Sequence, residues 1–448
     1  MNVTAIYGPP GTGKTETLIN MVSELYETYE DDMAVLSFSR SGARELLART
    51  TVKPRFVGTI HAMCFRELGL TRSRVADQDK YLEWVMGDEA QIRMSLQLGG
   101  YARRTGKNLE EVMDDFRWNL DMPPYHLVDY YWDSYINWKD GNALYDFDDM
   151  IDKTMDTSLR FGCVIVDEAQ DLSNQQWNLI KAITRSRLVM AGDDDQSIYT
   201  WAGANPTGML DFAVSDDRVL QQSYRVPKAI HSVAQATVKE ISYRKHKNYL
   251  PTNRAGLVML ADSFSAIDLK PDTLIMCRDR YVQEQIEEIL IEEAVPYNYV
   301  SPHRPGLFDN AWAKTIRAVI EGDLDRLVKY KSRLSPMGRH EVEQGRIPDN
   351  WMDAINVPVE WINYYDRVDL LDDPSITLST IHAQKGREAD HVILCTEHSP
   401  RTDEMMDSTP TRDDEIRVWY VGITRARKSL TLLGGGNNFI TLERRNDG

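Results

Sequence analysis

The sequence contains little cysteine, no long hydrophobic run and no excess of positive charge. Its four cysteines, spread over 448 residues, are too few and too far apart for a disulfide framework. They are Cys64, Cys163, Cys277 and Cys395, and three of them lie in or at the end of apolar, strand-like runs. We therefore expect buried free thiols rather than metal ligands, and a reducing, cytoplasmic compartment.

Membrane and export signals are also missing. No stretch is apolar over the length that a membrane-spanning helix needs, and the first residues show no signal-peptide pattern. Because strand-forming residues begin almost at Met1, there is little room for a targeting segment. We expect a protein without membrane association.

The net charge of −17 argues against diffuse electrostatic attraction to DNA or RNA. It leaves open a nucleic acid that is held in a local groove by backbone amides, hydroxyls and aromatic stacking. With 42% hydrophobic and 27% charged residues, the composition is that of an ordinary globular protein. A chain of this length is expected to form roughly two to four domains rather than one core.

The most informative stretch is the glycine-rich segment from Gly8 to Thr15, which reads Gly-Pro-Pro-Gly-Thr-Gly-Lys-Thr. It follows a strand-like run over Asn2–Tyr7 and opens a helix-like run over Lys14–Tyr29, the setting that a phosphate-binding loop requires. The glycines let successive backbone N–H groups face phosphate oxygens. Lys14 supplies a charge for the β- and γ-phosphates, and Thr15 supplies a hydroxyl for Mg²⁺. The segment predicts a nucleotide site.

Short apolar runs separated by helix-length segments predict a parallel sheet. Five such runs are Ala34–Phe38, Cys163–Val166, Leu188–Ala191, Leu274–Cys277 and His391–Cys395. Helices are expected over Ser41–Thr50, Pro227–Ile241 and Arg280–Glu293, with Ser41 as a helix cap and Pro227 in a first turn. This alternation indicates an α/β fold built from βαβ units.

Two regions interrupt the alternation. Residues 69–156 are helix-rich and hold the aromatics Trp84, Trp118, Tyr130, Tyr131, Trp132, Tyr135 and Trp138. A small helical domain with its own core is the simpler interpretation, and a base-stacking surface is the alternative. Residues 322–374, which include Pro336, Pro348 and Pro358, are expected to form an irregular insertion.

A four-residue word occurs twice, as Thr59-Ile60-His61-Ala62 and as Thr380-Ile381-His382-Ala383. Each copy follows a short β-like stretch, and the two copies fall at comparable places in two α/β blocks. We interpret the repeat as a trace of two related domains.

Two acidic loops follow buried strands. The first strand ends in Asp167 and Glu168, which suit Mg²⁺ binding and activation of an attacking water, with a solvated acidic turn as the alternative. The second loop reads Gly-Asp-Asp-Asp-Gln, and its Gln196 can reach a γ-phosphate while Tyr199 and Trp201 follow nearby. That loop would link hydrolysis to base contact; a polar turn with two core aromatics is the alternative.

Two arginines complete the set of candidate residues. Arg225 lies in Gln-Ser-Tyr-Arg, and Arg425 lies in Ile-Thr-Arg-Ala-Arg. Transition-state charge on a γ-phosphate calls for guanidinium groups, often from a second domain. A single arginine is more often a surface residue, so the interpretation depends on the whole set.

Together these motifs resemble the superfamily 1A DNA helicases of the UvrD, Rep and PcrA type. The segments that carry the resemblance are Val-Asp-Glu-Ala-Gln-Asp at 166–171, Gly-Asp-Asp-Asp-Gln-Ser-Ile-Tyr at 192–199, Thr-Ile-His-Ala-Gln-Lys-Gly-Arg-Glu at 380–388 and Tyr-Val-Gly-Ile-Thr-Arg-Ala at 420–426. The resemblance implies two RecA-like parallel-sheet P-loop domains, with a helical insertion in the first, a short insertion in the second, and ATP bound between the domains. The expected boundaries are 1–68 and 151–215 for the first domain, 69–150 for its insertion, 216–300 and 375–448 for the second domain, and 301–374 for its insertion.

The resemblance also implies roles for residues around ATP and Mg²⁺. The catalytic set is Lys14, Glu168, Gln196, Arg225 and Arg425, with both arginines supplied by the second domain. The nucleotide contacts are Gly8, Pro9, Pro10, Gly11, Thr12, Gly13, Lys14, Thr15, Glu16, Tyr224, Arg278 and Glu388, and the metal ligands are Thr15 and Asp167. Tyr224 would stack on adenine, and Glu388 would contact the ribose.

On the nucleic-acid side, the resemblance implies contacts with single-stranded DNA and with junctions between single strands and duplex. The matching residues are Phe38, Thr59, His61, Tyr199, Trp201, Thr380 and His382. The two Thr-Ile-His loops would grip the strand alternately, and movement is expected to run from 3′ to 5′.

Three features depart from the family pattern. The phosphate-binding loop begins at Gly8, which leaves no room for the family's upstream adenine-reading segment. Glu16 and Ala202 stand where arginines are usual, and the insertion at 301–374 is short. Three functions therefore remain open: a translocase that unwinds DNA, a translocase that displaces bound proteins with little unwinding, and a nucleotide-switched binding protein. RNA is also left open as a substrate.

Overall fold

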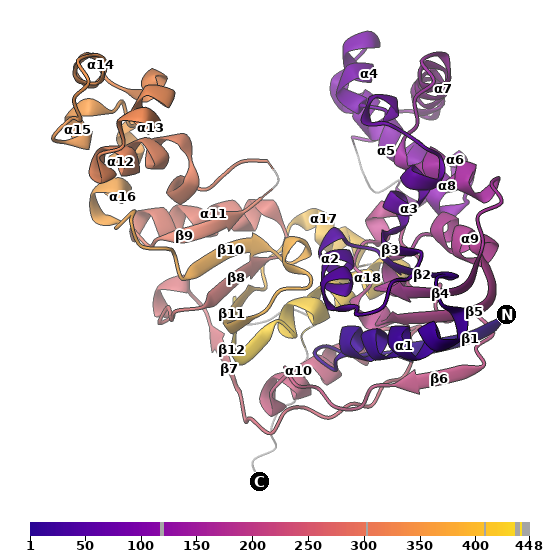
Figure 1. Ribbon diagram of the computed structural model, residues 1–448. Helices are drawn as coiled ribbons and strands as arrows, with labels where there is room; N and C mark the ends of the chain where they lie inside the picture. Colours follow the sequence, from indigo (N-terminus) through magenta and orange to yellow (C-terminus); the bar gives the residue numbers. More distant parts are fainter. Residues whose placement is uncertain (117–120, 302, 407–408, 435–439, 441–448) are drawn as a thin grey trace. The chain divides into compact units, whose positions relative to one another are not determined.

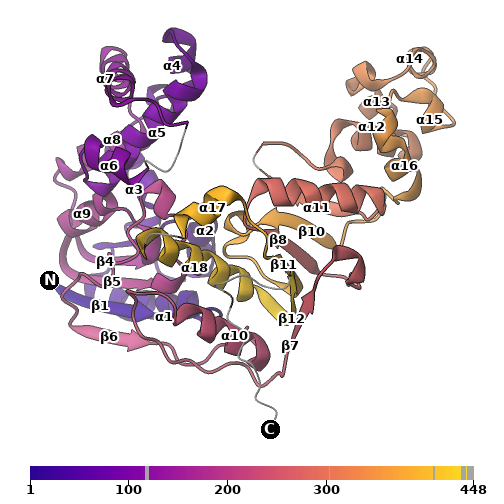
Figure 2. The ribbon, with the colours of Figure 1, turned by 180° about the vertical axis from the view of Figure 1, so that it is seen from behind.

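The computed structural model describes residues 1–116, 121–301, 303–406, 409–434 and 440, and the chain divides into two compact units. Unit 1 comprises residues 1–225, 241–252 and 404–417, and unit 2 comprises residues 226–240, 253–403 and 418–448. Each unit contains a six-stranded sheet whose neighbouring strands are parallel (Figures 1 and 2). The predicted α/β fold with two parallel-sheet domains is confirmed, whereas its detailed boundaries stay predictions.

The sheet of unit 1 has the strand order β3-β2-β4-β5-β1-β6. Its strands are β1 (Asn2–Tyr7), β2 (Met33–Ser37), β3 (Phe56–Thr59), β4 (Phe161–Asp167), β5 (Thr184–Gly192) and β6 (Asp216–Val219). The helices that cover it are α1 (Lys14–Tyr29), α2 (Arg40–Arg49), α3 (Ile60–Glu67), α8 (Phe147–Met155) and α9 (Asn174–Ile183).

Alternating side chains of the unit 1 strands form two separate apolar cores. On one face, Ile6 and Val35 pack with Leu18 of α1. On the other face, Val164 packs with Ile180 of α9, in a core that α3 and α8 also enter. Because helices cover both faces, the central strands are buried throughout, as their continuous apolar runs predicted.

The start of α2 differs from expectation. Ser39, not Ser41, caps this helix: its backbone is extended, and its hydroxyl accepts the N–H of Gly42 at 3.0 Å. The expected cap was wrong because both serines precede the same apolar pattern, and Ser39 is the one that leaves the strand in a β conformation.

A group of helices extends from unit 1 between β3 and β4 (Figure 1). They are α4 (Gln78–Trp84), α5 (Glu89–Thr105), α6 (Leu109–Asp115) and α7 (Tyr125–Gly141). Tyr81, Tyr135 and Trp138 are buried in a core of their own, so the simpler interpretation of the aromatic-rich region is confirmed. Trp84 and Tyr130 remain exposed, and Trp118 lies outside the described residues.

The sheet of unit 2 has the strand order β7-β12-β11-β8-β10-β9. Its strands are β7 (Leu257–Ala261), β8 (Thr273–Cys277), β9 (Tyr297–Val300), β10 (Ile376–Thr380), β11 (Ala389–Cys395) and β12 (Ala426–Leu433). Its helices include α10 (Lys228–Val238) and α11 (Arg280–Glu292), and helix α17 (Pro400–Met405) begins in unit 2 and ends in unit 1. Helix α18 (Thr409–Ile423) begins in unit 1 and ends in unit 2. All four cysteines are buried and free, as expected.

The region expected to be irregular is in fact helical. Residues 322–374 contain α13 (Leu324–Lys329), α14 (Pro336–Glu343), α15 (Trp351–Ala354) and α16 (Val359–Arg367), and α12 (Ala311–Glu321) directly precedes them. Pro336 stands in the first turn of α14 and Pro358 directly precedes α16, so these prolines lie at helix starts and do not break the helices. Ile316 and Tyr364 belong to the same core as Ile275 of β8, so this insertion has no separate core.

Candidate nucleotide site and nucleic-acid surface

The motif residues of unit 1 meet at the carboxyl ends of its parallel strands. Ser37 at the end of β2 pairs in register with Asp167 of β4 and with Thr59 of β3. Tyr7 at the end of β1 pairs with Gly192 of β5, and the N–H of Gly8 donates to the Gly192 carbonyl at 2.9 Å. The phosphate-binding loop and both acidic loops therefore leave the sheet along one edge, where ligands of such sheets bind.

The phosphate-binding loop has the backbone that its glycines allow. Gly11 and Gly13 have φ angles of +70° and +82°, which place both in the left-handed region. Lys14 begins α1, and its ammonium group donates to the Gly8 carbonyl at 2.9 Å, while the Thr12 hydroxyl donates to Pro9 at 2.8 Å. The loop thus precedes a helix N-terminus, a favourable place for an anion.

The segment that carries Tyr224 and Arg225 lies against this loop. The Ser223 hydroxyl donates to the Pro10 carbonyl at 2.7 Å, and the N–H of Tyr224 donates to Gly11 at 2.8 Å. These bonds place Arg225 at the end of unit 1, although a second-domain origin was expected. The Tyr224 ring is 74% exposed, so its face is open for stacking.

Asp167 and Glu168 follow β4 with contrasting surroundings. Asp167 is buried, and burial raises its pKa to about 7; the Glu168 carboxylate raises it as well, whereas Lys14 lowers it. Glu168 is one of few non-glycine residues with a left-handed backbone, at φ +53°. Such conformations cost about 1–3 kcal/mol and concentrate at functional sites.

Gln170 joins the two acidic loops. Its side-chain amide donates to the Glu168 carboxylate at 2.6 Å, and its carbonyl oxygen accepts the N–H of Asp193 at 3.0 Å. Asp193 in turn accepts a 2.6 Å hydrogen bond from the side chain of Gln196. The predicted water-activating and phosphate-sensing residues are therefore connected through two buried side chains.

Aromatic side chains continue from the Gln196 loop to the surface. Phe38, just after β2, stacks on Tyr199 with ring centroids 5.6 Å apart. Trp201 meets Tyr199 edge-on at 6.5 Å and is 53% exposed. Burial raises the pKa of the Tyr199 hydroxyl, and Asp171 and Glu168 raise it further. These rings form a partly exposed stacking surface next to the acidic residues.

His61 lies beside Phe147, with ring centroids 5.1 Å apart. Burial, together with the Arg104 guanidinium, lowers the His61 pKa to about 4, so this ring is neutral at physiological pH. Arg104 of α5 also donates to the Ala202 carbonyl at 2.8 Å and pairs with Asp148 at 3.0 Å. Arg104 therefore contacts the backbone of Ala202, the position where the resemblance led us to expect an arginine.

In unit 2 the predicted residues fall at opposite edges of the sheet. Arg278 follows β8 and Thr380 ends β10, and register pairing of Thr380 with Cys277 puts both at the carboxyl edge. Glu388 and Arg425 precede β11 and β12 at the amino edge. Within unit 2, the structure thus brings Arg278 together with Thr380 and not with Glu388.

The repeated Thr-Ile-His-Ala word has the same local geometry in both units. The Thr59 hydroxyl oxygen accepts the N–H of Ala62 at 3.2 Å, and that of Thr380 accepts the N–H of Ala383 at 3.4 Å. Each threonine ends a strand and starts a helical turn. His61 and His382 therefore occupy equivalent places, one in each unit.

Arg425 and Glu16 are held by their own units. Arg425 is almost completely buried, and its Nε donates to the Val421 carbonyl at 2.9 Å. Glu16 forms an ion pair with Arg49 of α2 at the surface. Arg427 lies 3.6 Å from the Glu388 carboxylate.

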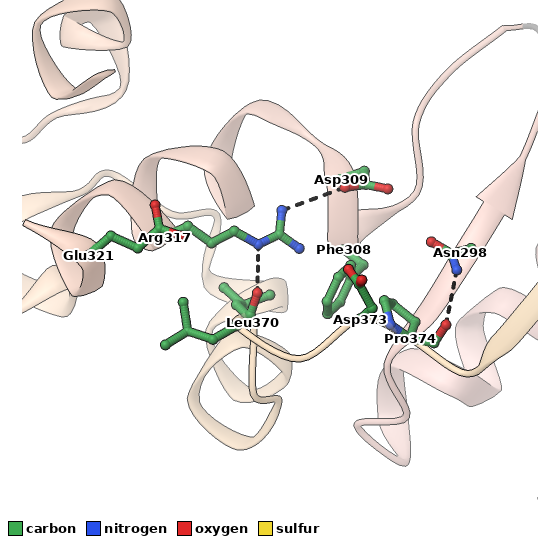
Figure 3. Close-up of a pocket in the computed structure, with 9 residues that line it drawn as sticks. Asn298, Phe308, Asp309, Arg317, Glu321, Leu370, Asp373 and Pro374 are labelled. Atoms are coloured by element: carbon green, nitrogen blue, oxygen red, sulfur yellow. Dashed lines mark hydrogen bonds and ion pairs between the residues drawn. The ribbon is translucent and has the colours of Figure 1, made fainter. Parts of the chain in front are cut away.

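A separate hollow of about 270 Å³ lies in unit 2, and none of the motif residues lines it (Figure 3). The Arg317 guanidinium there donates to the Leu370 carbonyl at 2.6 Å and lies 3.5 Å from Asp309. The Asn298 amide donates to Pro374 at 3.1 Å. Because these polar groups pair with one another, we assign the hollow no role.

Two features are absent from the part of the chain that the structure describes. No helix among these residues is both long and apolar enough to span a bilayer. Within the same residues, no group of three or more His, Cys, Asp or Glu side chains could hold a metal ion by itself. The predicted ligands Thr15 and Asp167 do not require such a group, because Mg²⁺ is usually bound by one or two protein oxygens together with substrate phosphates.

The sequence profile described as UvrD/REP helicase N-terminal domain matches residues 2–216, and the UvrD-like helicase C-terminal domain matches residues 360–434. The chain belongs to the UvrD/Rep helicase family. The motifs that carried the resemblance lie within or beside the matched ranges, and the family assignment made from them is confirmed.

Curated members of this family are similar at low identity. A probable DNA helicase II homolog of Mycoplasma capricolum is 25% identical over 289 residues, which cover 55% of this chain and 40% of that protein. The PcrA helicase of Staphylococcus epidermidis is 25% identical over 294 residues, covering 55% and 39%. The Rep helicase of Buchnera aphidicola is 25% identical over 356 residues, covering 64% and 54%.

The matched region thus spans between 39% and 54% of these relatives' lengths. Among solved structures, the helicase nonstructural protein 10 of an arterivirus matches with a TM-score of 0.38 and 11% identity, covering 98% of this chain and 61% of that one. This structural likeness is too weak to support an inference.

Several residues with a place in the site were not assigned a role from the sequence. They are Gln170, Ser223, Arg104, Arg244 and Lys247. Gln170 stood inside a recognised motif, and its position two residues after Glu168 was an available signal. The partners of the other four are distant in sequence, and no local pattern indicates such contacts.

Proposed function

We propose that this chain is an ATP-dependent DNA helicase that moves along single-stranded DNA from 3′ to 5′. The observation that carries the proposal is the single edge of the unit 1 sheet where four functions meet. Lys14, Glu168, Gln196 and Tyr199 lie there, and they would serve phosphate binding, water activation, phosphate sensing and base stacking, respectively. The direction of movement rests on family membership alone.

At the nucleotide end, the loop before α1 would cradle the phosphates of ATP. Its N–H groups and Lys14 offer positive charge to the β- and γ-phosphates. Glu168, held by Gln170 in a left-handed backbone, would accept a proton from the attacking water. Tyr224 would stack on the adenine with its exposed ring face.

Mg²⁺ fits the residues of this edge. Asp167 and Glu168 are adjacent, and the Asp167 pKa is raised first by burial and then by the Glu168 carboxylate, so a bound cation would favour the charged form of both. The Asp167 carboxylate and the Thr15 hydroxyl are the ligands that would hold it. When bound, Mg²⁺ would neutralise phosphate charge during phosphoryl transfer.

At the nucleic-acid end, stacking suits a chain with a net charge of −17. Phe38, Tyr199 and Trp201 can contact bases, an interaction worth about 1–3 kcal/mol per base. Thr59 and Thr380, which begin equivalent turns in the two units, would contact the strand in turn. His61 and His382 would accompany them as neutral or polar contacts.

The loop from Gly192 to Trp201 would couple the two ends. Gln196 would contact the γ-phosphate, and Tyr199 and Trp201, which follow it in the loop, would contact a base. Because Asp193 holds the Gln196 side chain, a change at the phosphate would be passed along the loop backbone. ATP would therefore favour one conformation of the motor and its hydrolysis another.

We assign the unit 2 residues to two different ligands. Glu388 and Arg425, at the amino edge of the sheet, would contact the nucleotide, and Arg225 would do so from unit 1. Arg278 would contact a phosphate of the nucleic acid strand, because it lies at the same edge as Thr380. The sequence had instead led us to expect that Arg278 contacts the nucleotide.

Unwinding of tailed DNA substrates tests the proposal. With ATP and Mg²⁺, a duplex with a 3′ single-stranded tail should be unwound, whereas 5′-tailed and blunt duplexes should not. Single-stranded DNA should stimulate ATP hydrolysis, and Glu168→Gln should abolish turnover while ATP still binds. ATP hydrolysis that ignores added DNA would contradict the proposal, and an RNA oligonucleotide in the same assay tests the alternative strand.

A second candidate is a translocase that displaces bound proteins and unwinds little. The observation that favours it is that α12–α16 share one core with the unit 2 sheet. This insertion therefore does not form a separate domain that could contact a duplex. A streptavidin-displacement assay on single-stranded DNA, run beside strand displacement, separates the two functions. Displacement without unwinding would favour this candidate.

A further inference from the structure

Three consecutive carboxylates are buried in the loop that carries Gln196. Asp193, Asp194 and Asp195 are each completely buried, between the end of β5 and Gln196. Adjacent buried carboxylates repel one another and lose hydration, so each needs a cation or several hydrogen bonds. The residues that supply these cations therefore determine how the loop is held in place.

The main cation comes from a distant segment of the chain. Lys247, in the stretch 241–252 that returns to unit 1, is itself completely buried. Its ammonium nitrogen lies 3.0 Å from the Asp193 carboxylate and 2.9 Å from that of Asp195, and it also pairs with Asp194. Burial alone would lower the Lys247 pKa, but the three carboxylates raise it above its usual value.

Further contacts fix the same segment on the loop. Arg244 makes a two-pronged contact with Asp195, in which its Nε lies 2.6 Å from the carboxylate. The N–H of Lys245 donates to the Asp194 carboxylate at 2.7 Å. Arg417 of α18 donates to the Asp194 carbonyl at 3.0 Å, so two segments far apart in sequence hold one loop.

The contact reaches Gln196 through one shared carboxylate. The two oxygens of Asp193 have different partners, since Oδ1 faces Lys247 and Oδ2 accepts the Gln196 side-chain amide at 2.6 Å. A lysine at this place keeps Asp193 charged and fixed, and a charged acceptor strengthens the bond to the Gln196 amide. Loss of the lysine would remove the cation paired with Asp193 and Asp194, whereas Asp195 would keep its contact with Arg244, and Asp193 would be free to move.

We propose that Lys247 is a positioning residue for ATP hydrolysis, which sets the orientation of Gln196 through Asp193 while Arg244 holds the adjacent Asp195. This inference rests on the proposed function, because it assigns a lysine to the phosphate sensor of that reaction. The segment 241–252 thereby controls the loop that joins the nucleotide to the stacking aromatics.

Lys247→Met is the direct test, and Lys139→Met is the matched control. Lys139 is the comparable buried lysine of unit 1, paired with Asp146 and Asp149 in the helical insertion. We expect Lys247→Met to lower the kcat of DNA-stimulated ATP hydrolysis at least about tenfold with little change in KM. Lys139→Met should lower thermal stability but leave kcat of the folded protein close to wild type, and Lys247→Arg should restore most of the rate.

A double-mutant cycle distinguishes positioning from general support of the fold. If Lys247 acts through Gln196, Lys247→Met should cost little further kcat once Gln196→Ala is present. Fully additive losses would overturn the proposal. Where Lys247→Met fails to fold, Lys247→Gln takes its place in the same cycle, with the same deciding outcome.

Hydrogen exchange gives a readout that needs no catalysis. In Lys247→Met, the Asp195 and Gln196 amides, which bond to Asp193, should exchange faster, whereas amides of the phosphate-binding loop should not change. Unchanged exchange at Asp195 and Gln196 would overturn the inference. Wild-type protein without DNA-stimulated ATP hydrolysis would instead contradict the proposed function, and the exchange measurement would still decide whether Lys247 holds the loop.

Discussion

The side-chain amide of Gln170 donates a 2.6 Å hydrogen bond to the carboxylate of Glu168. Gln170 is fully buried, and its other side-chain atom accepts the Asp193 N–H. The residue therefore fixes the expected general base with its amide nitrogen and the loop of the expected phosphate sensor with its side-chain oxygen. A methionine of similar volume would fill the space but make neither bond.

We expect Gln170→Met to lower kcat for ATP hydrolysis by about tenfold while ATP binding changes little. The control is Gln175→Met, since Gln175 is also buried and bonds to Asp152 at 2.7 Å, away from the loops. Steady-state ATPase kinetics with fluorescent nucleotide binding make the comparison. Equal kcat in the two variants would remove Gln170 from the mechanism.

Gly11 offers a second prediction, because its substitution combines backbone strain with a steric clash. Its φ is +70°, and an added Cβ would lie 2.3 Å from the Cβ of Arg225. We expect Gly11→Ala to weaken ATP binding at least about tenfold, a free-energy change of about 1.4 kcal/mol. The contact with Arg225 has to move before the loop can keep its shape.

The matched control for this prediction is Gly106→Ala. Gly106 has a φ of +74°, and an added Cβ would meet no atom within 4 Å. That substitution should therefore cost only the backbone strain, about 1 kcal/mol of stability, and leave ATP binding intact. Isothermal titration and thermal unfolding of both variants separate strain from clash; equal ATP affinity in the two would contradict the expectation.

The extent to which the sequence predicts this fold depends on how local each signal is. The loop from Gly8 to Thr15 and the strand before it were predicted because glycine spacing and apolar alternation act between near neighbours. The helices around Pro336 and Pro358 were missed because proline also starts helices, and the sequence alone did not distinguish the two uses.

In the candidate site, too, only the local signals could be predicted from the sequence. Glu168 and Gln196 were recognised from short motifs, but the cations that hold the Gln196 loop were not. Lys247 and Arg244 lie in an ordinary basic stretch, about fifty residues after the acids that they contact. A basic stretch on its own indicates a solvated surface, and only the folded chain shows that Lys247 is buried.

His61 provides a pH-dependent prediction. Its pKa falls from 6.5 to about 4 on folding, first through burial and then through Arg104. The folded state therefore binds a proton less readily than the unfolded state. The contribution of His61 to stability should be fully present above about pH 6.5 and be lost as the pH falls towards 4.

Unfolding measurements at several pH values check this sign. The difference in unfolding free energy between wild type and His61→Phe should be constant above about pH 6.5. Below that pH, the wild type should lose stability steadily relative to the variant. In an NMR titration of the imidazole, Arg104→Gln should move the midpoint upward. A wild-type midpoint near 6.5 would show that the folded chain does not lower the pKa of this ring.

The opposite edges of the unit 2 sheet give the last prediction, a separation of functions between two arginines. Arg278 lies beside Thr380 at the carboxyl edge, whereas Arg425 and Glu388 lie at the amino edge, where the residues that follow them, Ala426 and Ala389, pair in register. We expect Arg278→Ala to weaken single-stranded DNA binding about three- to tenfold and to flatten its salt dependence, because one phosphate contact is lost.

Arg425→Ala should show the converse pattern. Its kcat for ATP hydrolysis should fall by about a hundredfold or more, as for other arginines that stabilise phosphoryl transfer, while DNA affinity without nucleotide stays near wild type. Because Arg425 is buried and bonds to Val421, its stability must be followed by thermal unfolding, with Arg425→Lys as the variant that keeps the charge. If Arg278→Ala instead raised the KM for ATP and spared DNA binding, Arg278 would belong to the nucleotide, and the division of the sheet by edges would be wrong.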